Sequence, residues 1–319
     1  MSSGSLAAPP VHLWIYNHPL HGISDQIEFY LSIMRQNGYR AGVGRQPRQD
    51  ALNIVIENFS DATSGVLRKF CRDTGKRVAV IMTEHLDFID QEIYIHGSRL
   101  WSDNDYMHPA TQFARIRHLM DCACHIRGFF VLGDLPELLN MQMMLPGIAI
   151  RTLPFPRLAR PAAMVGWDQL PADFAFTGAA TRFREEVLQL VRTRLTVEHP
   201  GGFLSRKARD NFSRTGRVVL NIPQRVDWKW LSLMRVIAAL RCGRATVSLG
   251  TNDTSQIAKC CLQLDIAAPE LLGRLAALAA RGEEIFEVQF ADYHAMAEAF
   301  LREHAFPRDF FEYWAVTEL

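Results

Sequence analysis

The stretch RVVLNIPQRVDWKWLSLMRVIAALRCGRATVSL, residues 217–249, decides the fold class of this 319-residue chain. It opens with a short apolar run at 217–222, continues with a helical pattern over 228–240 and closes with a second apolar run at 246–249. The run at 217–222 does not alternate regularly between apolar and polar residues, as a strand with one exposed face would. Such strands, joined by a helix, are typical of a parallel sheet covered on both faces. The stretch therefore predicts an α/β fold.

The same alternation of short apolar runs and helical patterns continues on both sides. Strands are predicted at residues 12–16, 52–56, 77–82, 129–132, 148–153, 173–177 and 195–199, and helices at 24–36, 61–73, 109–126, 136–144, 183–194, 207–214, 269–278 and 292–303. Ser24 is the expected cap of the helix at 24–36. Residues 87–108 show no period and are predicted as a long loop, which either borders an active site, as such loops often do, or is a plain excursion on the surface.

A proline-rich stretch without periodicity, around Pro154, Pro156, Pro161 and Pro171, is the predicted domain boundary. The length is roughly twice the commonest domain size, which also favours two domains. We therefore predict two Rossmann-like doubly wound domains, over residues 1–155 and 156–305, followed by an aromatic tail at 306–319 that needs an apolar surface to pack on.

The composition narrows the classes of function. With 35 Lys and Arg against 34 Asp and Glu, the net charge of +1 gives no field for collecting nucleic acid or an anionic membrane, although a local basic pocket stays open. The apolar stretches fall far short of the roughly 20 residues that a membrane-spanning helix needs. The start, MSSGSLAAPP, lacks a signal-peptide pattern. We expect a cytoplasmic protein with reduced cysteines, no bound metal and at most peripheral membrane contact.

In open parallel sheets, ligands bind beyond the carboxyl ends of the strands, so the residues that follow each strand are candidates for the site. After the first strand come His21 and Gly22, where the histidine can act as a general base or simply belong to a polar capping loop. After the strand at 77–82 come Glu84 and His85. A carboxylate beside an imidazole can share a proton, while the alternative is a helix cap made by Thr83.

The second half contributes an anion-binding pattern. After the strand at 173–177 come Gly178, Ala179, Thr181, Arg182 and Arg184. Small residues let backbone N–H groups approach a phosphate, a helix start adds its dipole, and guanidinium groups suit phosphate. A plain strand-to-helix turn is the alternative.

Three further polar positions follow. Asn221 and Gln224 lie in a proline-stiffened turn after the strand at 217–222, and Arg235 lies within the helix at 228–240. Arg235 is a candidate anion ligand or else a solvated side chain.

Residues 173–254 resemble the carboxy-terminal domain of GT-B glycosyltransferases, particularly bacterial group 1-like enzymes. Three segments carry the resemblance by their order and spacing: Phe176-Thr177-Gly178 followed by Arg182 and Arg184, the strand Val219-Leu220-Asn221-Ile222, and RVIAALRCGRATVS at 235–248. The resemblance implies two Rossmann-like domains facing across a cleft, with a nucleotide-sugar donor held mainly by the second domain and an acceptor by the first. It also implies that a helix at 306–319 crosses back to the first domain. The residues implied to face the donor are Gly22, Gly178, Ala179, Thr181, Arg182, Asn221, Gln224 and Arg235.

The resemblance implies an enzyme that transfers sugar from a nucleotide-diphosphate donor to a hydroxyl of a glycan, lipid or protein, as in polysaccharide biosynthesis, with neither metal nor cofactor. Arg182 and Arg235 would stabilise the leaving diphosphate, and His21 or the Glu84–His85 pair would be the base. Members often carry two glutamates where this chain has Trp230 and Ala238, and the second holds the ribose. A catalytically silent binding or scaffold protein is therefore one alternative, and a nucleotide-sugar epimerase on the same plan is another.

Overall fold

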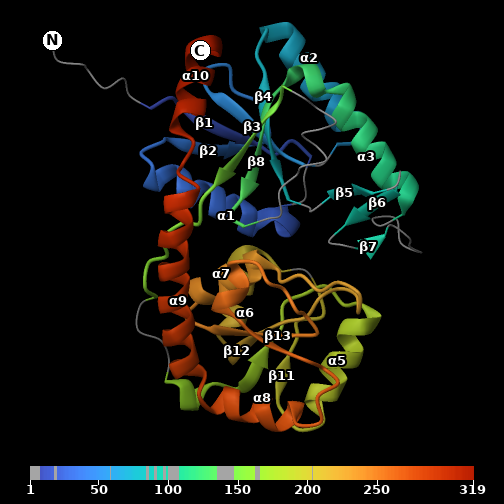
Figure 1. The fold of residues 1–319 in the computed structure, drawn as a ribbon, viewed down its shortest axis with the longest axis vertical. Coiled ribbons are helices and arrows are strands. Elements are labelled where there is room, and N and C mark those ends of the chain that lie inside the picture. The colour runs from blue at the N-terminus through green and yellow to red at the C-terminus, as the bar shows by residue number, and fades with distance from the viewer. Residues whose placement is uncertain are drawn as a thin grey trace, which may run out of the picture. The chain divides into compact units, whose positions relative to one another are not determined.

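The computed structural model describes residues 8–17, 20–57, 59–83, 86–89, 92–95, 98–99, 108–134, 147–161, 166–202 and 204–319. Contacts between residues divide the chain into two compact units. The first unit comprises Met1–Pro19, Gln26–Pro156 and Leu301–Leu319, and the second comprises Leu20–Asp25 and Arg157–Phe300. Figure 1 shows the elements of both units.

A six-stranded parallel sheet forms the centre of the first unit, in the order β2-β1-β3-β4-β8-β9. Its strands are β1 (Val11–Trp14), β2 (Ala41–Gly44), β3 (Leu52–Ile56), β4 (Val78–Met82), β8 (Ile126–Leu132) and β9 (Ala149–Leu153). The chain runs from β1 to β2 on one side and then returns to β3 on the other side of β1. The direction of winding therefore reverses between β1 and β3.

Helices of the first unit begin and end at clear signals in the sequence. They are α1 (Leu20–Gln36, whose first residues group with the second unit), α2 (Asp61–Thr74), α3 (Pro109–Asp121) and α10 (Arg308–Glu318). Ser60 and Thr63 form a capping box at the start of α2, and Gly75, with φ 71°, ends it in the left-handed conformation that glycine adopts most readily.

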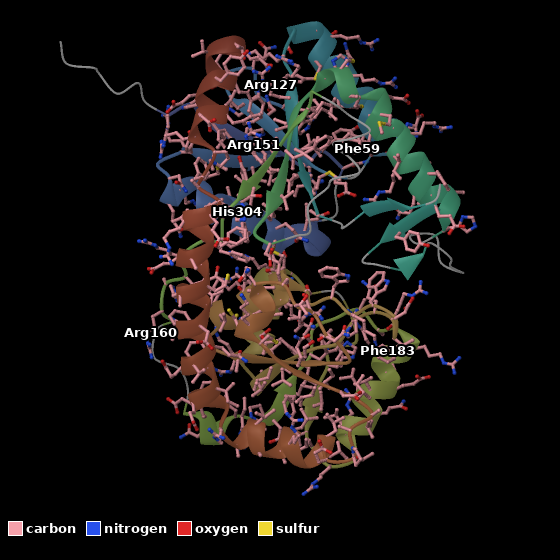
Figure 2. The ribbon with its side chains drawn as sticks, in the orientation of Figure 1. Phe59, Arg127, Arg151, Arg160, Phe183 and His304 are labelled. Atoms are coloured by element: carbon pink, nitrogen blue, oxygen red, sulfur yellow. The ribbon has the colours of Figure 1, made fainter. Side chains whose placement is uncertain are left out.

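Helix α10 packs within the first unit through its aromatic side chains. Phe311 is fully buried and stacks on Phe130 of β8 with 5.2 Å between the ring centroids. Arg127, on the same strand, lies over the Tyr313 ring at 4.6 Å and is labelled in Figure 2. The aromatic tail thus finds its apolar surface on β8.

A small antiparallel sheet corrects the prediction of a loop over residues 87–108. Its strands are β5 (Leu86–Ile89), β6 (Glu92–Ile95) and β7 (Ser98–Arg99), and Leu86 of β5 is paired with Ile95 of β6. The sequences LDFI and EIYI alternate apolar and polar residues in part, which is the period of a half-exposed strand. The runs are too short for the pattern to stand out.

The second unit has a five-stranded parallel sheet in the order β11-β10-β12-β13-β14. Its strands are β10 (Ala172–Ala175), β11 (Val197–Glu198), β12 (Gly216–Asn221), β13 (Ala245–Leu249) and β14 (Leu262–Leu264). Its helices are α5 (Arg182–Arg192), α6 (Arg206–Ser213), α7 (Leu233–Arg241), α8 (Leu271–Ala280) and α9 (Gly282–Glu303, which ends in the first unit). The winding reverses between β10 and β12.

The two strand orders confirm the predicted α/β fold class with two doubly wound parallel sheets. Several boundaries were predicted wrongly. Helix α1 begins at Leu20 rather than Ser24, directly after a proline, a residue that favours helix starts. Helix α7 begins at Leu233 rather than at 228, and α9 is longer than the predicted 292–303. Within the described residues, no helix is long and apolar enough to cross a membrane.

Candidate functional site

The strongest candidate site lies at the carboxyl edge of the second sheet, where β10 and β12 end side by side. The winding reverses between these strands, and open α/β sheets commonly bind ligands at such a reversal. Phe176 follows β10 directly, and Ile222 follows β12. Two arginines, Arg184 from α5 and Arg235 from α7, reach this edge.

Arg184 is buried, with 5% of its surface exposed. Its Nε donates to the Ile222 carbonyl at 2.9 Å and its Nη1 donates to the Ala179 carbonyl at 3.0 Å. The guanidinium lies 5.4 Å from the centroid of the Phe176 ring. Burial, and then the charge of Arg235, lower the pKa of Arg184 to about 9. The group still carries its charge at neutral pH.

Arg235 contacts the same ring from α7. Its Nη1 donates to Oδ1 of Asn221 at 3.0 Å, and its guanidinium is also 5.4 Å from the Phe176 centroid. Burial lowers the pKa of Arg235 to about 10, while the carboxylate of Asp25 raises it and the charge of Arg209 lowers it.

The charge of these two arginines is not compensated by direct contact. Among the described residues, neither Arg184 nor Arg235 makes an ion pair with a carboxylate, whereas Arg209 pairs with Asp25 at 2.6 Å. Two desolvated cations that repel each other attract an anion strongly, because guanidinium groups bind phosphate oxygens through charge-assisted hydrogen bonds. The edge of the second sheet therefore carries the kind of charge that suits an anion.

Asn221 holds Arg235 in place through a buried network. Its Nδ2 donates to Oγ of Ser248 at 2.7 Å, and Oγ1 of Thr251 donates to the same oxygen at 2.7 Å. Asn221 is only 1% exposed. With its amide oxygen and nitrogen both engaged, we interpret Asn221 as a residue that positions Arg235. Its implied place facing the nucleotide-sugar donor stays a prediction.

Four of the predicted positions come together around the start of α5. The Thr181 hydroxyl accepts from the Arg184 N–H at 3.3 Å and donates to the Gln224 carbonyl at 2.9 Å, so it both caps the helix and joins the two loops. A Cβ on Gly178 would lie 2.3 Å from the Phe176 ring. Only glycine therefore permits this close approach, beside Ala179.

The structure pairs Arg182 on the surface instead of bringing it to this cluster. Its side chain is 94% exposed, and its Nε donates to the Glu186 carboxylate at 2.9 Å. The charge is thus balanced on α5 itself. The predicted contact of Arg182 with a diphosphate stays a prediction, while Arg184 is on the buried face of the same helix.

The remaining candidates are Gly22, His21, Glu84 and His85. Gly22 is exposed in α1, with no atom within 4 Å of the position of a Cβ. His21 falls in the first turn of α1 rather than in a loop, and its side chain lies outside the described part of the structure. Glu84 and His85 also lie outside the described residues.

Sequence reasoning missed an ion pair at the carboxyl end of β3 in the first sheet. The Glu57 carboxylate, which follows β3, accepts from Arg115 Nη2 at 3.0 Å and from the Thr83 N–H at 3.0 Å. It thereby fixes the chain just before Glu84. No local signal links Glu57 to Arg115, because they are 58 positions apart and on separate elements.

Within the described residues, no cluster of three or more His, Cys, Asp or Glu is arranged to hold a metal ion. The six cysteines are all free.

Comparison with known proteins gives similarities of fold only. No protein-family model matches the sequence, and no curated protein matches it either. Among solved structures, the chain is similar to Phytolacca americana UGT2 complexed with UDP-2-fluoro-glucose and pterostilbene, with 9% identity, 96% of this chain and 100% of that chain covered, and a TM-score of 0.49. It is similar to T4 phage β-glucosyltransferase at 11% identity and a TM-score of 0.46, and the match covers 93% of this chain and 99% of that chain. It is also similar to an α1,3-fucosyltransferase at 10% identity and a TM-score of 0.41, and that match covers 91% of this chain and 83% of that chain.

Proposed function

We propose that this protein is a glycosyltransferase that moves a sugar from a nucleotide-diphosphate donor to an acceptor hydroxyl. One observation carries the proposal: Arg184 and Arg235 lie against the same ring, Phe176, at the carboxyl edge of a parallel sheet, and neither has a carboxylate partner among the described residues. The order of motifs that resembles GT-B enzymes falls on this edge.

The arginines have a defined part in the reaction. When the bond between the sugar carbon and the diphosphate oxygen breaks, negative charge develops on the leaving diphosphate. Fixed cations in a water-poor site stabilise that charge, and the N–H groups in the first turn of α5 add the positive end of the helix dipole. Arg184 and Arg235 would thus supply the charge that a metal ion supplies elsewhere. We propose on this basis that transfer is metal-independent.

The acceptor hydroxyl must lose its proton as its oxygen bonds to the sugar carbon. His21, in the first turn of α1, and the Glu84–His85 pair are the proposed bases, because imidazole and carboxylate side chains titrate in a range suited to this transfer.

A catalytically silent binding protein is the second candidate. It is favoured by Trp230 and Ala238, which occupy the positions of the family's paired glutamates. A methyl group cannot accept the ribose hydroxyls, and each charged hydrogen bond lost there is worth about 1.5 to 3 kcal/mol.

Release of nucleoside diphosphate tests the two candidates. The full-length protein is incubated with a panel of UDP-, GDP-, ADP- and dTDP-sugars, with pooled acceptor alcohols and glycans, and with EDTA in half of the samples. The proposal predicts that one donor is consumed, that EDTA does not change the rate, and that Arg235→Gln slows it while the exposed Arg194→Gln does not. A donor that stabilises the protein against heat without being consumed identifies the silent protein and rejects the enzyme.

A further inference from the structure

A buried histidine, His199, contacts the loop that joins β10 to α5. Its side chain is 5% exposed, and its Nδ1 lies 3.6 Å from the Glu185 carboxylate, which is longer than a hydrogen bond. Its Nε2 lies 2.9 Å from the Gly178 carbonyl oxygen, and its ring packs against the Phe176 ring with 5.2 Å between the centroids. Because a carbonyl oxygen only accepts hydrogen bonds, Nε2 carries a proton and donates to this oxygen. His199 therefore fixes the direction of the Gly178 carbonyl.

The next carbonyl of the same loop is also held. The Ala179 carbonyl accepts from Nη1 of Arg184 at 3.0 Å. Both peptide bonds are trans, and in a trans peptide the C=O of one residue and the N–H of the next point in opposite directions. The N–H of Ala179 therefore points away from His199, and the N–H of Ala180 points away from Arg184.

These two N–H groups are available to a ligand. Among the described residues, neither donates to another group of the protein. Ala180 is exposed and Ala179 is half-buried. The N–H groups of Arg182 and Phe183 follow in the first turn of α5, where a helix has no partners of its own for them. Successive unpaired N–H groups of this kind bind phosphate oxygens in many proteins.

The peptide between Gly178 and Ala179 needs a group that holds its direction. Glycine has the widest choice of backbone angles, and a turned peptide would present its carbonyl oxygen to a phosphate in place of the N–H. Two oxygens that carry negative charge repel each other, so the turned loop would reject an anion. A side chain cannot stiffen this position, since a Cβ on Gly178 would lie 2.3 Å from the Phe176 ring. The hydrogen bond from His199 fixes the peptide instead.

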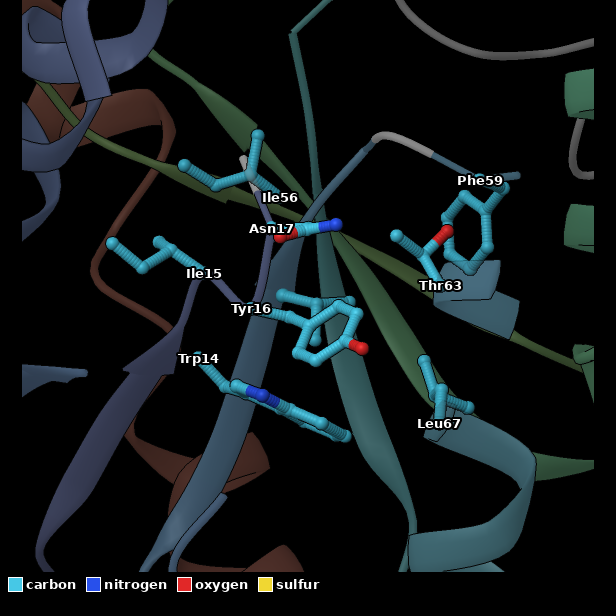
Figure 3. A pocket seen from close by; sticks show the side chains of 9 residues that line it. Trp14, Ile15, Tyr16, Asn17, Ile56, Phe59, Thr63 and Leu67 are labelled. Carbon is cyan, nitrogen blue, oxygen red and sulfur yellow. The ribbon is translucent and has the colours of Figure 1, made fainter. Parts of the chain in front are cut away.

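The reversal of winding in the first sheet has a different surface. Figure 3 shows the pocket there, with Trp14, Tyr16 and Phe59 in its lining. None of the nine described side chains that line it carries a charge at neutral pH. Within the described part of the chain, an imidazole and a guanidinium that hold a loop with unpaired N–H groups therefore distinguish the reversal in the second sheet.

We propose that His199 is a positioning residue for an anion: by holding the Gly178 carbonyl, it keeps the N–H of Ala179 directed at a phosphate oxygen of the ligand. The inference rests on the proposed function in one respect, since the phosphates are then those of the nucleotide-sugar donor. Binding of a free diphosphate does not require that function.

The sequence offers a specific probe of this peptide, because Gly178-Ala179 is its only Gly-Ala pair. With ¹³C at the glycine carbonyls and ¹⁵N on the alanines, a carbonyl-selected NMR spectrum of the full-length protein shows one amide signal, that of Ala179. The ligand is inorganic pyrophosphate, which carries two phosphates without a sugar or a base. We expect this signal to shift in the wild type as pyrophosphate is added, with the affinity that calorimetry measures.

Three variants separate the hydrogen bond from the rest of the histidine. His199→Leu should weaken pyrophosphate at least about tenfold, the usual loss for one hydrogen bond to a charged group, and reduce the Ala179 shift accordingly. His199→Gln, whose amide can donate to the Gly178 carbonyl, should bind within about twofold of the wild type. His294→Leu is the matched control, because it removes an imidazole that lies 3.1 Å from the Leu158 carbonyl in the same unit, and it should leave the affinity unchanged.

The outcomes separate this inference from the proposed function. No binding of pyrophosphate to the wild type, binding that leaves the Ala179 signal unmoved, or equal affinity in a folded His199→Leu protein overturns the inference. An equal loss in His199→Leu and His199→Gln also overturns it. If His199→Leu does not fold, the Ala179 shift in His199→Gln decides, and an unmoved signal there is the contrary result. Variants that behave as expected in a protein that consumes no donor support the role of His199 and count against the proposed function alone.

Discussion

The guanidinium of Arg235 is fixed by the side chain of Asn221, whose Oδ1 accepts from Nη1 at 3.0 Å. Asn221 is itself held by Ser248 at the end of the neighbouring strand β13. Hydrogen bonds therefore hold the charged guanidinium in a fixed position relative to the sheet, and this position is set before any ligand binds. Preorganised charge of this kind is what stabilises a leaving anion.

A carboxylate beside Arg235 should neutralise this charge. Asn221→Asp keeps an oxygen for Arg235, and the Ser248 hydroxyl can turn to donate to the new carboxylate, so the fold should persist. We expect the affinity for UDP or the preferred nucleoside diphosphate to fall at least tenfold, which corresponds to about 1.4 kcal/mol. Calorimetry measures this affinity, with Ser248→Ala as the control that loses the bonds of the Ser248 hydroxyl with Asn221 and Thr251 without adding charge. Equal affinity in wild type and Asn221→Asp would show that the charge of Arg235 does not serve an anion.

Arg184 has a structural part that can be measured separately. Arg184→Met removes the donors to the Ile222 and Ala179 carbonyls while filling the same space. Because each buried group left without a partner costs about 1 to 3 kcal/mol, the free energy of unfolding should fall by about 2 to 4 kcal/mol. Urea unfolding measures the loss, and Arg194→Met, on the surface, should change stability little. A stability loss no larger than that of Arg194→Met would contradict the bonding described for Arg184.

Acid should destabilise the first unit through His12. This side chain is buried in β1, its Nε2 donates to the Gln46 carbonyl at 2.9 Å, and its Nδ1 has no partner among the described residues. Burial lowers the pKa of His12 below 6.5, with the Gln46 bond opposing the shift. The unfolded chain therefore binds the proton more tightly, so stability is full above pH 6.5 and declines as the pH falls below it.

Urea unfolding between pH 5 and pH 8 checks the effect of His12. The slope of stability against pH should be shallower in His12→Gln than in wild type. Some slope should remain, because burial also lowers the pKa of His125. Parallel curves for the two proteins would mean that His12 takes up its proton equally well in the folded state.

The carboxy-terminal helix should contribute strongly to the stability of the first unit. Phe311 is fully buried and lies against Phe130, and it also stacks on Phe306 at 5.4 Å. Phe311→Ala should reduce the free energy of unfolding by about 3 to 5 kcal/mol. Val316→Ala, at a position that is 82% exposed, is the control and should change it by less than about 0.5 kcal/mol. A small effect of Phe311→Ala would place α10 outside the core.

Much of the fold could be predicted from the sequence because buried parallel strands are mostly apolar. Strand β4, VAVIM, is a continuous apolar run, and β12 contains the apolar run Val218–Leu220. Strand β2 was missed because its sequence, AGVG, is short, rich in glycine and half-buried. Strand β14 has only three residues.

The sequence analysis assigned the diphosphate to Arg182, whereas the structure brings Arg184, two positions further along α5, to the edge of the sheet. On α5, Arg184 shares a helical stripe with Val187, Leu188 and Val191, all buried, whereas Arg182 and Glu186 form an exposed pair four positions apart. The spacing of three, four and seven positions between Arg184 and the apolar residues Val187, Leu188 and Val191 is visible in the sequence, and it assigns Arg184 to the inner face of the helix. The bond between Asn221 and Ser248 is not visible there, since it joins two strands whose pairing only the fold defines.

The affinity of a nucleoside diphosphate for the wild type and for Arg235→Gln tests the central claim most directly. Calorimetry with UDP, GDP, ADP and dTDP should find one that binds, with an affinity at least tenfold lower in Arg235→Gln and unchanged in Arg194→Gln, both proteins being folded. Binding that is equally tight in Arg235→Gln, or absent for all four nucleotides in the wild type, would contradict an anion site at the ends of β10 and β12.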